Sequence, residues 1–328
     1  MRIIDPTEIS DVQNSYPLFF QPSYAKYELS KGWQLQIISD DEGAAIPLRT
    51  RKTYFIKQAQ YLYPPVKNGK RLEPVQERTF LDELLVFCRR SGVCDFISPP
   101  QHYSVFESLP RHSYYTEIGI ITLNLQKSEE ELLGGFASSC RNKIKKAINA
   151  GLTVKFGTEY FDTFYELYKG IHDKQGIYYD SKQDLEKMLN NLDKEQYIIA
   201  VTVKDEDILG AALVLLNGAE AYYYHSGTIA DCPFQGVNNL LQYRLFQYMQ
   251  ELGVKRYCMG GCRLGEIKGT KYEGIQTFKL SFGAEIEKGY HFFSEITWRY
   301  KVYKTLLKYY LAARGIKENR TGLDFKYN

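Results

Sequence analysis

The chain has 328 residues, of which 44% are hydrophobic and 25% are charged, and its formal net charge is +3. This composition is typical of a globular protein of about two domains, and the charge is too small to indicate nucleic-acid binding by itself. No apolar run reaches the roughly 20 residues of a membrane-spanning helix.

The first third of the chain predicts a hairpin followed by a helix and two strands. WQLQIIS (33–39) alternates apolar and polar residues, DDEG turns, and AAIPLRTRK (44–52) returns. Gly92 supplies the stop for the helix. The other elements expected here are a proline-broken loop at 61–66, a helix at 74–90, and strands at 93–100 and 118–125.

The second part opens with a capping box, in which Ser128 stands three residues before Glu131. The helix that follows is interrupted by Gly134 and Gly135 and stops at Gly151. The elements expected after it are a strand at 152–156, helices at 160–171 and from 181, strands at 196–203, 208–216 and 220–227, a long helix at 236–253, a strand at 254–261, a short helix through 278, a strand through 293, and a basic helix at 295–314.

This order of three antiparallel strands, helix, strand, helix and strand predicts a mixed α/β (α+β) sheet with a βαβ crossover. The first part shows a fainter version of the same order, which indicates an internal structural duplication. We expect two domains, residues 1–135 and residues 136–328, the second ending in the amphipathic helix.

The cysteines and histidines point away from disulfide and metal chemistry. Six cysteines are scattered without a C-x-x-C pair, which predicts free thiols in a reducing cytoplasm. Five histidines show no metal-ligand spacing, so no metal site is expected. The first ten residues carry acids early and lack the apolar stretch of a secretory signal, so we expect a cytoplasmic protein.

Three segments carry a resemblance to a known family. They are SCRNKIKKAINAGLTVKFG (139–157), YYYHSGTIADCPFQGVNNLLQYRLFQYMQELGVKRYCMGG (222–261) and GIQTFKLSFGAE (274–285). In this order and spacing the second half of the chain resembles the Fem family of aminoacyl-transferases, within the GNAT (N-acetyltransferase-like) superfamily. The resemblance implies two tandem GNAT-like domains and aminoacyl transfer from a tRNA ester to an amine of a peptidoglycan precursor. The best-known members carry a coiled-coil arm in the second domain, and residues 157–196 of this chain are too few to form one.

Lys279 interrupts an apolar run just before Phe282 and Gly283. Gly283 indicates the end of a helix, which places Lys279 near that end, beside the buried stripe. By pattern alone, a surface lysine whose stem follows apolar neighbours is the commoner case. The resemblance favours a functional lysine, a fixed cation for the oxyanion of acyl transfer, and implies that Phe278 beside it contacts substrate.

The segment FQGVNNLL begins the long helix after a strand and a loop. In GNAT proteins a glycine-rich loop at this place binds a pyrophosphate through backbone N–H groups. Here only Gly236 remains, followed by Val237, Asn238 and Asn239, so cofactor binding and an ordinary helix start are equally supported. The degenerate loop argues against tight acetyl-CoA binding.

Two further sets of side chains have a structural and a functional interpretation each. Arg141 and Lys145 share one side of a basic helix, where a solvated face is the usual outcome, but the resemblance places this helix beside the acceptor cleft. Tyr224 and His225 end the third strand, where His225 could take the proton of the attacking amine; a structural Tyr–His pair in the sheet is the more common alternative.

The terminal helix carries Lys301, Lys304, Lys308 and Arg314 beside tyrosines. Basic amphipathic helices can lie on anionic membranes, although a helix that docks on its own domain is the commoner case. Peripheral contact of this helix with the inner face of a membrane is therefore an alternative hypothesis.

Taken together, the sequence predicts an acyl- or aminoacyl-transferase that acts by direct attack of an amine. The acceptor is expected to be a nucleotide- or lipid-linked precursor of peptidoglycan or a surface polysaccharide. No tightly bound cofactor is expected, and the donor, aminoacyl-tRNA or acyl-CoA, is a co-substrate. Two alternatives stay open: an acyl-CoA-dependent N-acetyltransferase, and a degenerate GNAT-like protein that only binds a ligand. The oligomeric state is undetermined.

Overall fold

The structure is a computed structural model that describes residues 1–8, 16–99, 103–176, 178–315 and 326–328. The chain forms two compact units, one of residues 1–119 with 288–328 and one of residues 120–287. It passes between them within two strands, β8 (Tyr114–Asn124) and β14 (Glu285–Glu295). This division differs from the expected boundary at 135/136, because the end of β14 pairs with a strand of the first unit and brings residues 288–328 back to it.

The first unit is a mixed sheet with helices. Its elements, besides parts of β8 and β14, are β1 (Arg2–Ile4), a 3-10 turn η2 (Leu18–Phe20), α1 (Pro22–Ser30), β2 (Gln34–Ser39), β3 (Ala44–Thr53), β4 (Ile56–Tyr61), β5 (Val66–Lys67), β6 (Lys70–Arg71), α2 (Pro74–Ser91), β7 (Phe96–Ser98), α9 (Trp298–Ala313) and β15 (Lys326–Tyr327). Strands β1, β2, β3, β4, β7 and β14 lie side by side in that order. The predicted hairpin is β2–β3, and the predicted helix is α2, which stops at Gly92 with φ +65°. Strands β1 and β4 and helix α1 were not predicted, and Pro100, the end of one predicted strand, lies outside the described residues.

The second unit contains most of the predicted elements. They are α3 (Glu129–Gly135), α4 (Ser138–Asn149), β9 (Thr153–Phe156), η3 (Thr158–Tyr160), α5 (Phe161–Gln175), α6 (Lys182–Asn191), η4 (Lys194–Gln196), β10 (Tyr197–Lys204), β11 (Asp207–Asn217), β12 (Glu220–Thr228), α7 (Val237–Glu251), β13 (Arg256–Cys262) and α8 (Lys271–Leu280). The Ser128 capping box is confirmed, since its hydroxyl accepts from the Glu131 amide and the Glu131 carboxylate accepts from the Ser128 amide.

The second unit also contains the predicted crossover. Strands β10, β11 and β12 are antiparallel neighbours, and β13 pairs with β12 in parallel after α7. The first unit repeats this topology, with β2, β3 and β4 antiparallel and β7 parallel to β4 after α2. The predicted duplication is therefore present in the topology of both units, and the predicted mixed α/β fold is confirmed.

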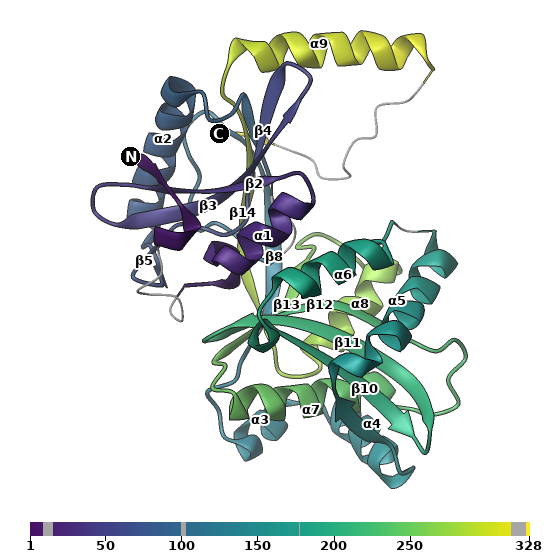
Figure 1. Cartoon of the computed structure of the whole chain (residues 1–328). Helices are drawn as coiled ribbons and strands as arrows, with labels where there is room; N and C mark the ends of the chain where they lie inside the picture. Colours follow the sequence, from purple (N-terminus) through teal and green to yellow (C-terminus); the bar gives the residue numbers. More distant parts are fainter. Residues whose placement is uncertain (9–15, 100–102, 177, 316–325) are drawn as a thin grey trace. The chain divides into compact units, whose positions relative to one another are not determined.

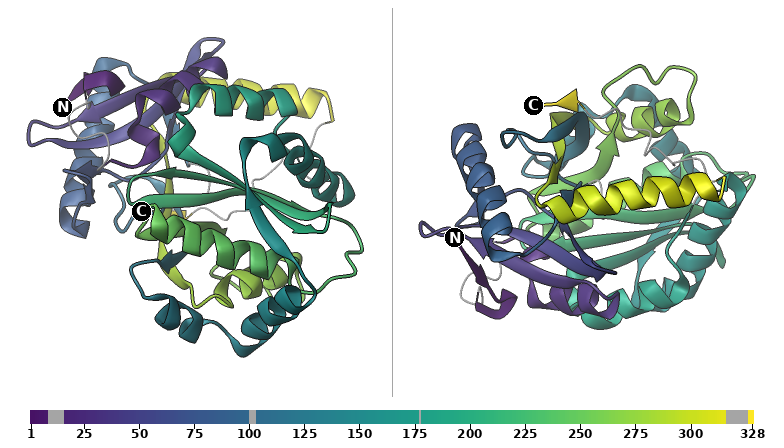
Figure 2. Two further views of the ribbon diagram at one scale, coloured as in Figure 1. Left: turned by 60° about the horizontal axis from the view of Figure 1, so that its bottom comes forward. Right: turned by 90° about the horizontal axis from the view of Figure 1, so that it is seen from above.

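Helices cover both faces of the second sheet. In Figure 1 α5 and α6 lie on one side of β10–β12, and α3, α4 and α7 lie on the other. The left view of Figure 2 shows the same layers, with the sheet between α5 and α7. Apolar residues of β10–β13, α4 and α7 form one buried core. The described residues of segment 157–196 form the helices α5 and α6 and the 3-10 turns η3 and η4, with no coiled-coil arm among them.

Two predictions about the whole chain can be compared with the structure. All six cysteines are free thiols, and five of them are buried, with Cys232 half-buried. Among the described residues, none of the helices combines the length and apolar character needed to cross a membrane.

Candidate active site of the second unit

The parallel pairing of β12 and β13 is short, and we call the region beyond the last pair, where the two strands continue without pairing to each other, the opening of the sheet. Pairing runs from Glu220 opposite Arg256 to Tyr222 opposite Cys258, while β12 continues to Thr228. Strand β12 also contains a bulge, because His225 pairs with Leu213 and Tyr223 pairs with Val214. Tyr224 is thus the extra residue of the bulge. A bulge changes the direction of the side chains at its position, and bulges are common next to active sites.

Lys279 lies in the last turn of α8, as the sequence predicts. The side chain is half-buried. Its ammonium is near Cys258 and Cys262 of β13, at and beyond the last pair with β12. Gly283, with φ +68°, follows the helix, and Phe282 is fully buried below it. Lys279 is therefore held at the edge of the opening by a helix whose other side belongs to the core.

The electrostatics around Lys279 leave its charge uncompensated. Burial lowers the pKa of Lys279. Burial also raises the pKa of Cys258 to about 11 and raises that of Cys262, so both thiols are neutral near pH 7. Within the described part of the chain, no hydrogen bond or ion pair reaches the Lys279 ammonium. A cation in this state favours a ligand or an intermediate that carries negative charge.

His225 is fixed on the other strand of the opening by a carboxylate and aromatic rings. Its Nε2 lies 3.1 Å from Oδ2 of Asp180, and both side chains are less than one fifth exposed. The imidazole stacks on Tyr168 with ring centroids 4.3 Å apart, and the Tyr224 ring is also 4.3 Å away. Because an ionised carboxylate accepts hydrogen bonds, this contact favours the tautomer of His225 that carries its proton on Nε2. The arrangement is compatible with His225 as a proton acceptor and equally with His225 as part of a structural Tyr–His pair.

The start of α7 is shaped by the neighbouring helix α4. Gly236 has φ +83°, and a Cβ there would lie 2.2 Å from the carbonyl oxygen of Lys143. Val237 is buried, the hydroxyl of Thr228 donates to Oδ1 of Asn238 at 2.9 Å, and Nδ2 of buried Asn239 donates to Sγ of Cys140. Packing therefore accounts for all four residues, and a role in cofactor binding stays a prediction.

Arg141 and Lys145 are exposed on α4, and Phe278 is half-buried on α8. Nη1 of Arg141 donates to the carbonyl oxygens of Leu133, Gly134 and Phe136, at the end of α3. Lys145 is exposed. Phe278 is half-buried and packs edge-on against Phe282 at 5.1 Å. Their contact with substrate stays a prediction, but Arg141 also has a structural task that the sequence did not reveal.

This task gives a test that separates Arg141 from Lys145. Arg141→Ala leaves the carbonyls at the end of α3 without their donor, so the free energy of unfolding is expected to fall by about 1 kcal/mol. Lys145→Ala is expected to change it by less than about 0.5 kcal/mol, as exposed substitutions usually do. Urea unfolding of both variants measures the difference. Equal stability would show that the Arg141 contacts contribute nothing, and acceptor binding measured at two salt concentrations tests the anion-binding role of both.

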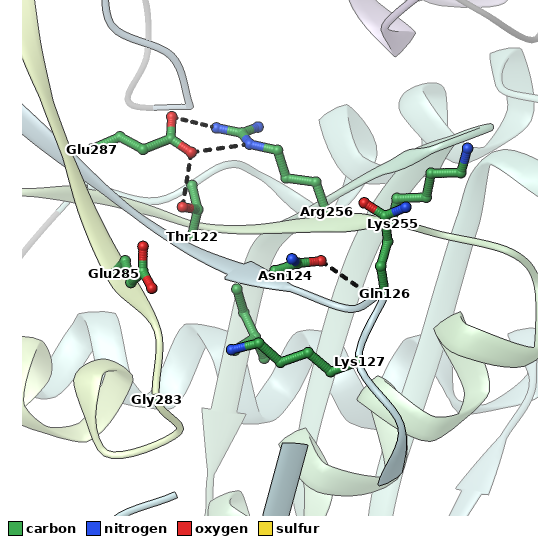
Figure 3. A pocket seen from close by; sticks show the side chains of 10 residues that line it. Thr122, Asn124, Gln126, Lys127, Lys255, Arg256, Gly283, Glu285 and Glu287 are labelled. Atoms are coloured by element: carbon green, nitrogen blue, oxygen red, sulfur yellow. Dashed lines mark hydrogen bonds and ion pairs between the residues drawn. The ribbon is translucent and has the colours of Figure 1, made fainter. Parts of the chain in front are cut away.

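A polar cavity of about 240 Å³ lies at the opposite end of β13 from Cys262. Figure 3 shows its network, in which the Arg256 guanidinium pairs with Glu287 at 2.8 Å and the Thr122 hydroxyl donates to the same carboxylate at 2.8 Å. Glu220 pairs with Arg256 as well, at 3.3 Å. Arg256 therefore pairs with both carboxylates of this network, and the lining contains neither Lys279 nor His225. We therefore place the candidate site at the opening between β12 and β13.

Sequence reasoning missed Asp180 and Tyr168 as partners of His225, and Cys258 and Cys262 as neighbours of Lys279. No local signal marks Asp180, which follows a tyrosine pair and lies 45 residues before His225. The cysteines could have been found from strand alternation, because positions 258 and 262 of one strand face the same side. Among the described residues, no group of three or more His, Cys, Asp or Glu side chains is arranged to hold a metal ion.

Comparison with known proteins identifies the domain and the fold. Residues 135–279 match the family model described as an acetyltransferase (GNAT) domain. No curated protein matches the sequence significantly. A solved structure of FemX is similar at a TM-score of 0.68 and 16% identity, covering 89% of this chain and 97% of that one.

Two other solved structures share the fold. One is the C-terminal domain of a putative lysylphosphatidylglycerol synthetase from Agrobacterium fabrum, with a TM-score of 0.56, 12% identity, and coverage of 88% of this chain and 90% of that one. The other is L-PGS from Bacillus licheniformis, with a TM-score of 0.55, 13% identity, and coverage of 89% and 93%. The predicted resemblance is thus confirmed for the GNAT domain by the domain match and for the Fem-like architecture by the fold.

Proposed function

We propose that this chain, whose residues 135–279 form an acetyltransferase (GNAT) domain in a Fem-like fold, transfers an acyl or aminoacyl group to an amine of a cell-envelope precursor. The observation that carries the proposal is Lys279, a half-buried cation without an ion pair among the described residues, placed where β12 and β13 stop pairing. The Fem-like sequence segments support a cell-wall acceptor. One structural relative is named as a putative lysylphosphatidylglycerol synthetase, and this name describes a product in which an amino acid is joined to a membrane lipid.

The proposed reaction is a direct transfer in a complex of protein, donor and acceptor. The amine nitrogen attacks the carbonyl carbon of the donor, and the carbonyl oxygen becomes an oxyanion beside Lys279. The bond from that carbon to the ester oxygen or thioester sulfur then breaks, and the leaving group takes up a proton. The amine gives up a proton as the new bond forms, and His225, oriented by Asp180, is the proposed acceptor.

Lys279 suits the oxyanion better than the ground-state carbonyl. The charge of Lys279 is only partly solvated, and the neutral thiols of Cys258 and Cys262 do not compensate it. A full negative charge on the oxyanion therefore gains more from the ammonium than a neutral carbonyl does, and this difference is what lowers a barrier.

The start of α7 supports an aminoacyl-tRNA as the donor over an acyl-CoA. The turn at Gly236 packs against the Lys143 backbone, and the side chains of Asn238 and Asn239 already hold Thr228 and Cys140. A pyrophosphate would have to bind with the N–H groups of this crowded turn. The acetyltransferase description of the domain keeps acyl-CoA as the alternative donor.

The donor preference is tested by calorimetry and by turnover. We expect acetyl-CoA to bind weakly or not at all, and an aminoacyl-tRNA mixture to support transfer of a labelled amino acid to a peptidoglycan-precursor nucleotide. Micromolar affinity for acetyl-CoA with acetyl transfer would instead identify an acyl-CoA-dependent enzyme. Ligand binding without turnover for every donor would identify a binding protein.

A further inference from the structure

Helix α9 has two apolar faces, and only one of them is used within its own unit. Tyr300 packs against Phe96 at 4.3 Å and Phe293 at 5.6 Å, and with Tyr303 it forms the inner face. The outer face consists of Trp298, Val302, Leu306 and Tyr309, which are 71%, 41%, 55% and 70% exposed. Their spacing of four, four and three residues places them in one stripe along the helix.

The tip of the β3–β4 hairpin adds two exposed aromatic residues next to this helix. Tyr54 is 84% exposed and Phe55 is 45% exposed. The Phe55 ring lies 6.1 Å from Tyr303 of α9, so segments far apart in the sequence meet here. Figure 1 shows the hairpin tip below α9, and the right view of Figure 2 shows the length of the helix. Tyr54 has φ +55°, a conformation that costs a tyrosine more than a glycine or asparagine.

The charged residues of α9 itself are all basic. The sequence from Trp298 to Arg314 contains no Asp or Glu, and its basic residues are Arg299, Lys301, Lys304, Lys308 and Arg314. The strand ends of the hairpin add the exposed residues Arg51, Lys52 and Lys57. One of these charges is compensated, since Lys304 pairs with Glu295 at 2.7 Å. The surface therefore combines an apolar stripe with a cationic border.

We propose that α9 and the β3–β4 tip form a membrane-contact surface that binds anionic lipid bilayers. Aliphatic side chains at the centre of the stripe, Val302 and Leu306, gain from apolar burial and offer nothing to a nucleic-acid base, which separates this surface from an RNA site. Trp298 and Tyr309 suit the headgroup level, where amphipathic rings gather, and the lysines suit lipid phosphates. The proposal goes beyond the transferase function and does not depend on Lys279.

The chain carries its own probe for this contact. It has two tryptophans, of which Trp33 is buried at 7% exposure and Trp298 is exposed. Adding vesicles of phosphatidylcholine with phosphatidylglycerol to the full chain is expected to shift Trp298 emission to the blue. Pure phosphatidylcholine vesicles are expected to give a much smaller shift, and added salt to weaken the binding.

Variants of the stripe decide the question. Trp298→Ser combined with Leu306→Ser is expected to weaken co-sedimentation with anionic vesicles by about tenfold or more, because burial of either side chain contributes on that scale. Leu29→Ser combined with Val75→Ser removes apolar residues of similar exposure elsewhere in the unit and is expected to leave binding unchanged. Thermal unfolding confirms that both double variants fold.

Three results would overturn the proposal. The first is a wild-type chain that does not bind anionic vesicles, and the second is an equal loss in the control variant. The third is binding to bulk tRNA that competes with the vesicles and is unaffected by Leu306→Ser, since that outcome assigns the surface to RNA.

Discussion

Replacing Lys279 by Met is expected to lower kcat by about 10²–10³-fold while the protein remains folded, the loss typical of one oxyanion donor. Methionine keeps the apolar stem that passes beside Cys258 and Cys262 but has no charge. The matched control is Lys255→Met, because Lys255 is an exposed lysine of the same unit. Steady-state rates of both variants with the same donor and acceptor measure the effect. Full activity of Lys279→Met would remove Lys279 from the mechanism.

The lowered pKa of Lys279 gives this prediction a pH signature. Only the protonated lysine stabilises an oxyanion, so wild-type activity is expected to fall as the pH rises through the pKa of Lys279, which burial places below the roughly 10.4 of an exposed lysine. The Met variant is expected to lack this basic limb.

Stability should move in the opposite direction from activity. Between the lowered pKa of folded Lys279 and the higher pKa of the unfolded chain, the unfolded chain binds more protons, so stability rises with pH there. At neutral pH both states carry the charge, and the folded state bears the cost of burying it. Lys279→Met is therefore expected to unfold at the same temperature as wild type or a higher one. A marked drop in the unfolding temperature would mean that the lysine contributes to the fold.

Replacing Gly236 by Ala is expected to destabilise the protein by about 2–4 kcal/mol. A Cβ at this position lies 2.2 Å from the carbonyl oxygen of Lys143 and 2.7 Å from its carbon, and helix backbone cannot move aside cheaply. The φ of +83° adds strain of its own for any residue with a Cβ. Chemical denaturation of the variant measures the sum of both effects.

Gly253 provides the matched control at the other end of α7. It has a similar φ of +79°, but a Cβ there meets nothing within 4 Å. Gly253→Ala is therefore expected to cost only the backbone strain, about 1 kcal/mol. The difference between the two variants isolates the contact of α7 with α4. Equal effects at both glycines would mean that the two helices separate at no cost.

The sequence alone determined the local elements and the position of the candidate lysine. Alternation predicted the hairpin β2–β3, and runs separated by short turns predicted β10–β12. Helical spacing predicted α2, with a glycine stop, and α7, because these signals depend on neighbours within a few residues. The capping box at Ser128 is a signal of the same range. Lys279 was placed in the last turn of a helix ended by Gly283, since an apolar stripe and a glycine are again local.

Only the tertiary structure decided which distant segments meet. The return of residues 288–328 to the first unit follows from the pairing of Ser294 with Ile97, which no local pattern contains. Asp180 reaches His225 because α5 and the segment after it cross β12, and Arg141 is drawn to the end of α3 because that helix ends with carbonyls lacking partners. The outer stripe of α9 became visible only once Tyr300 and Tyr303 were known to be its inner face. Such pairings depend on the order of strands in the sheets and on which side of a helix is covered, and neither is encoded in the spacing of residues along one element.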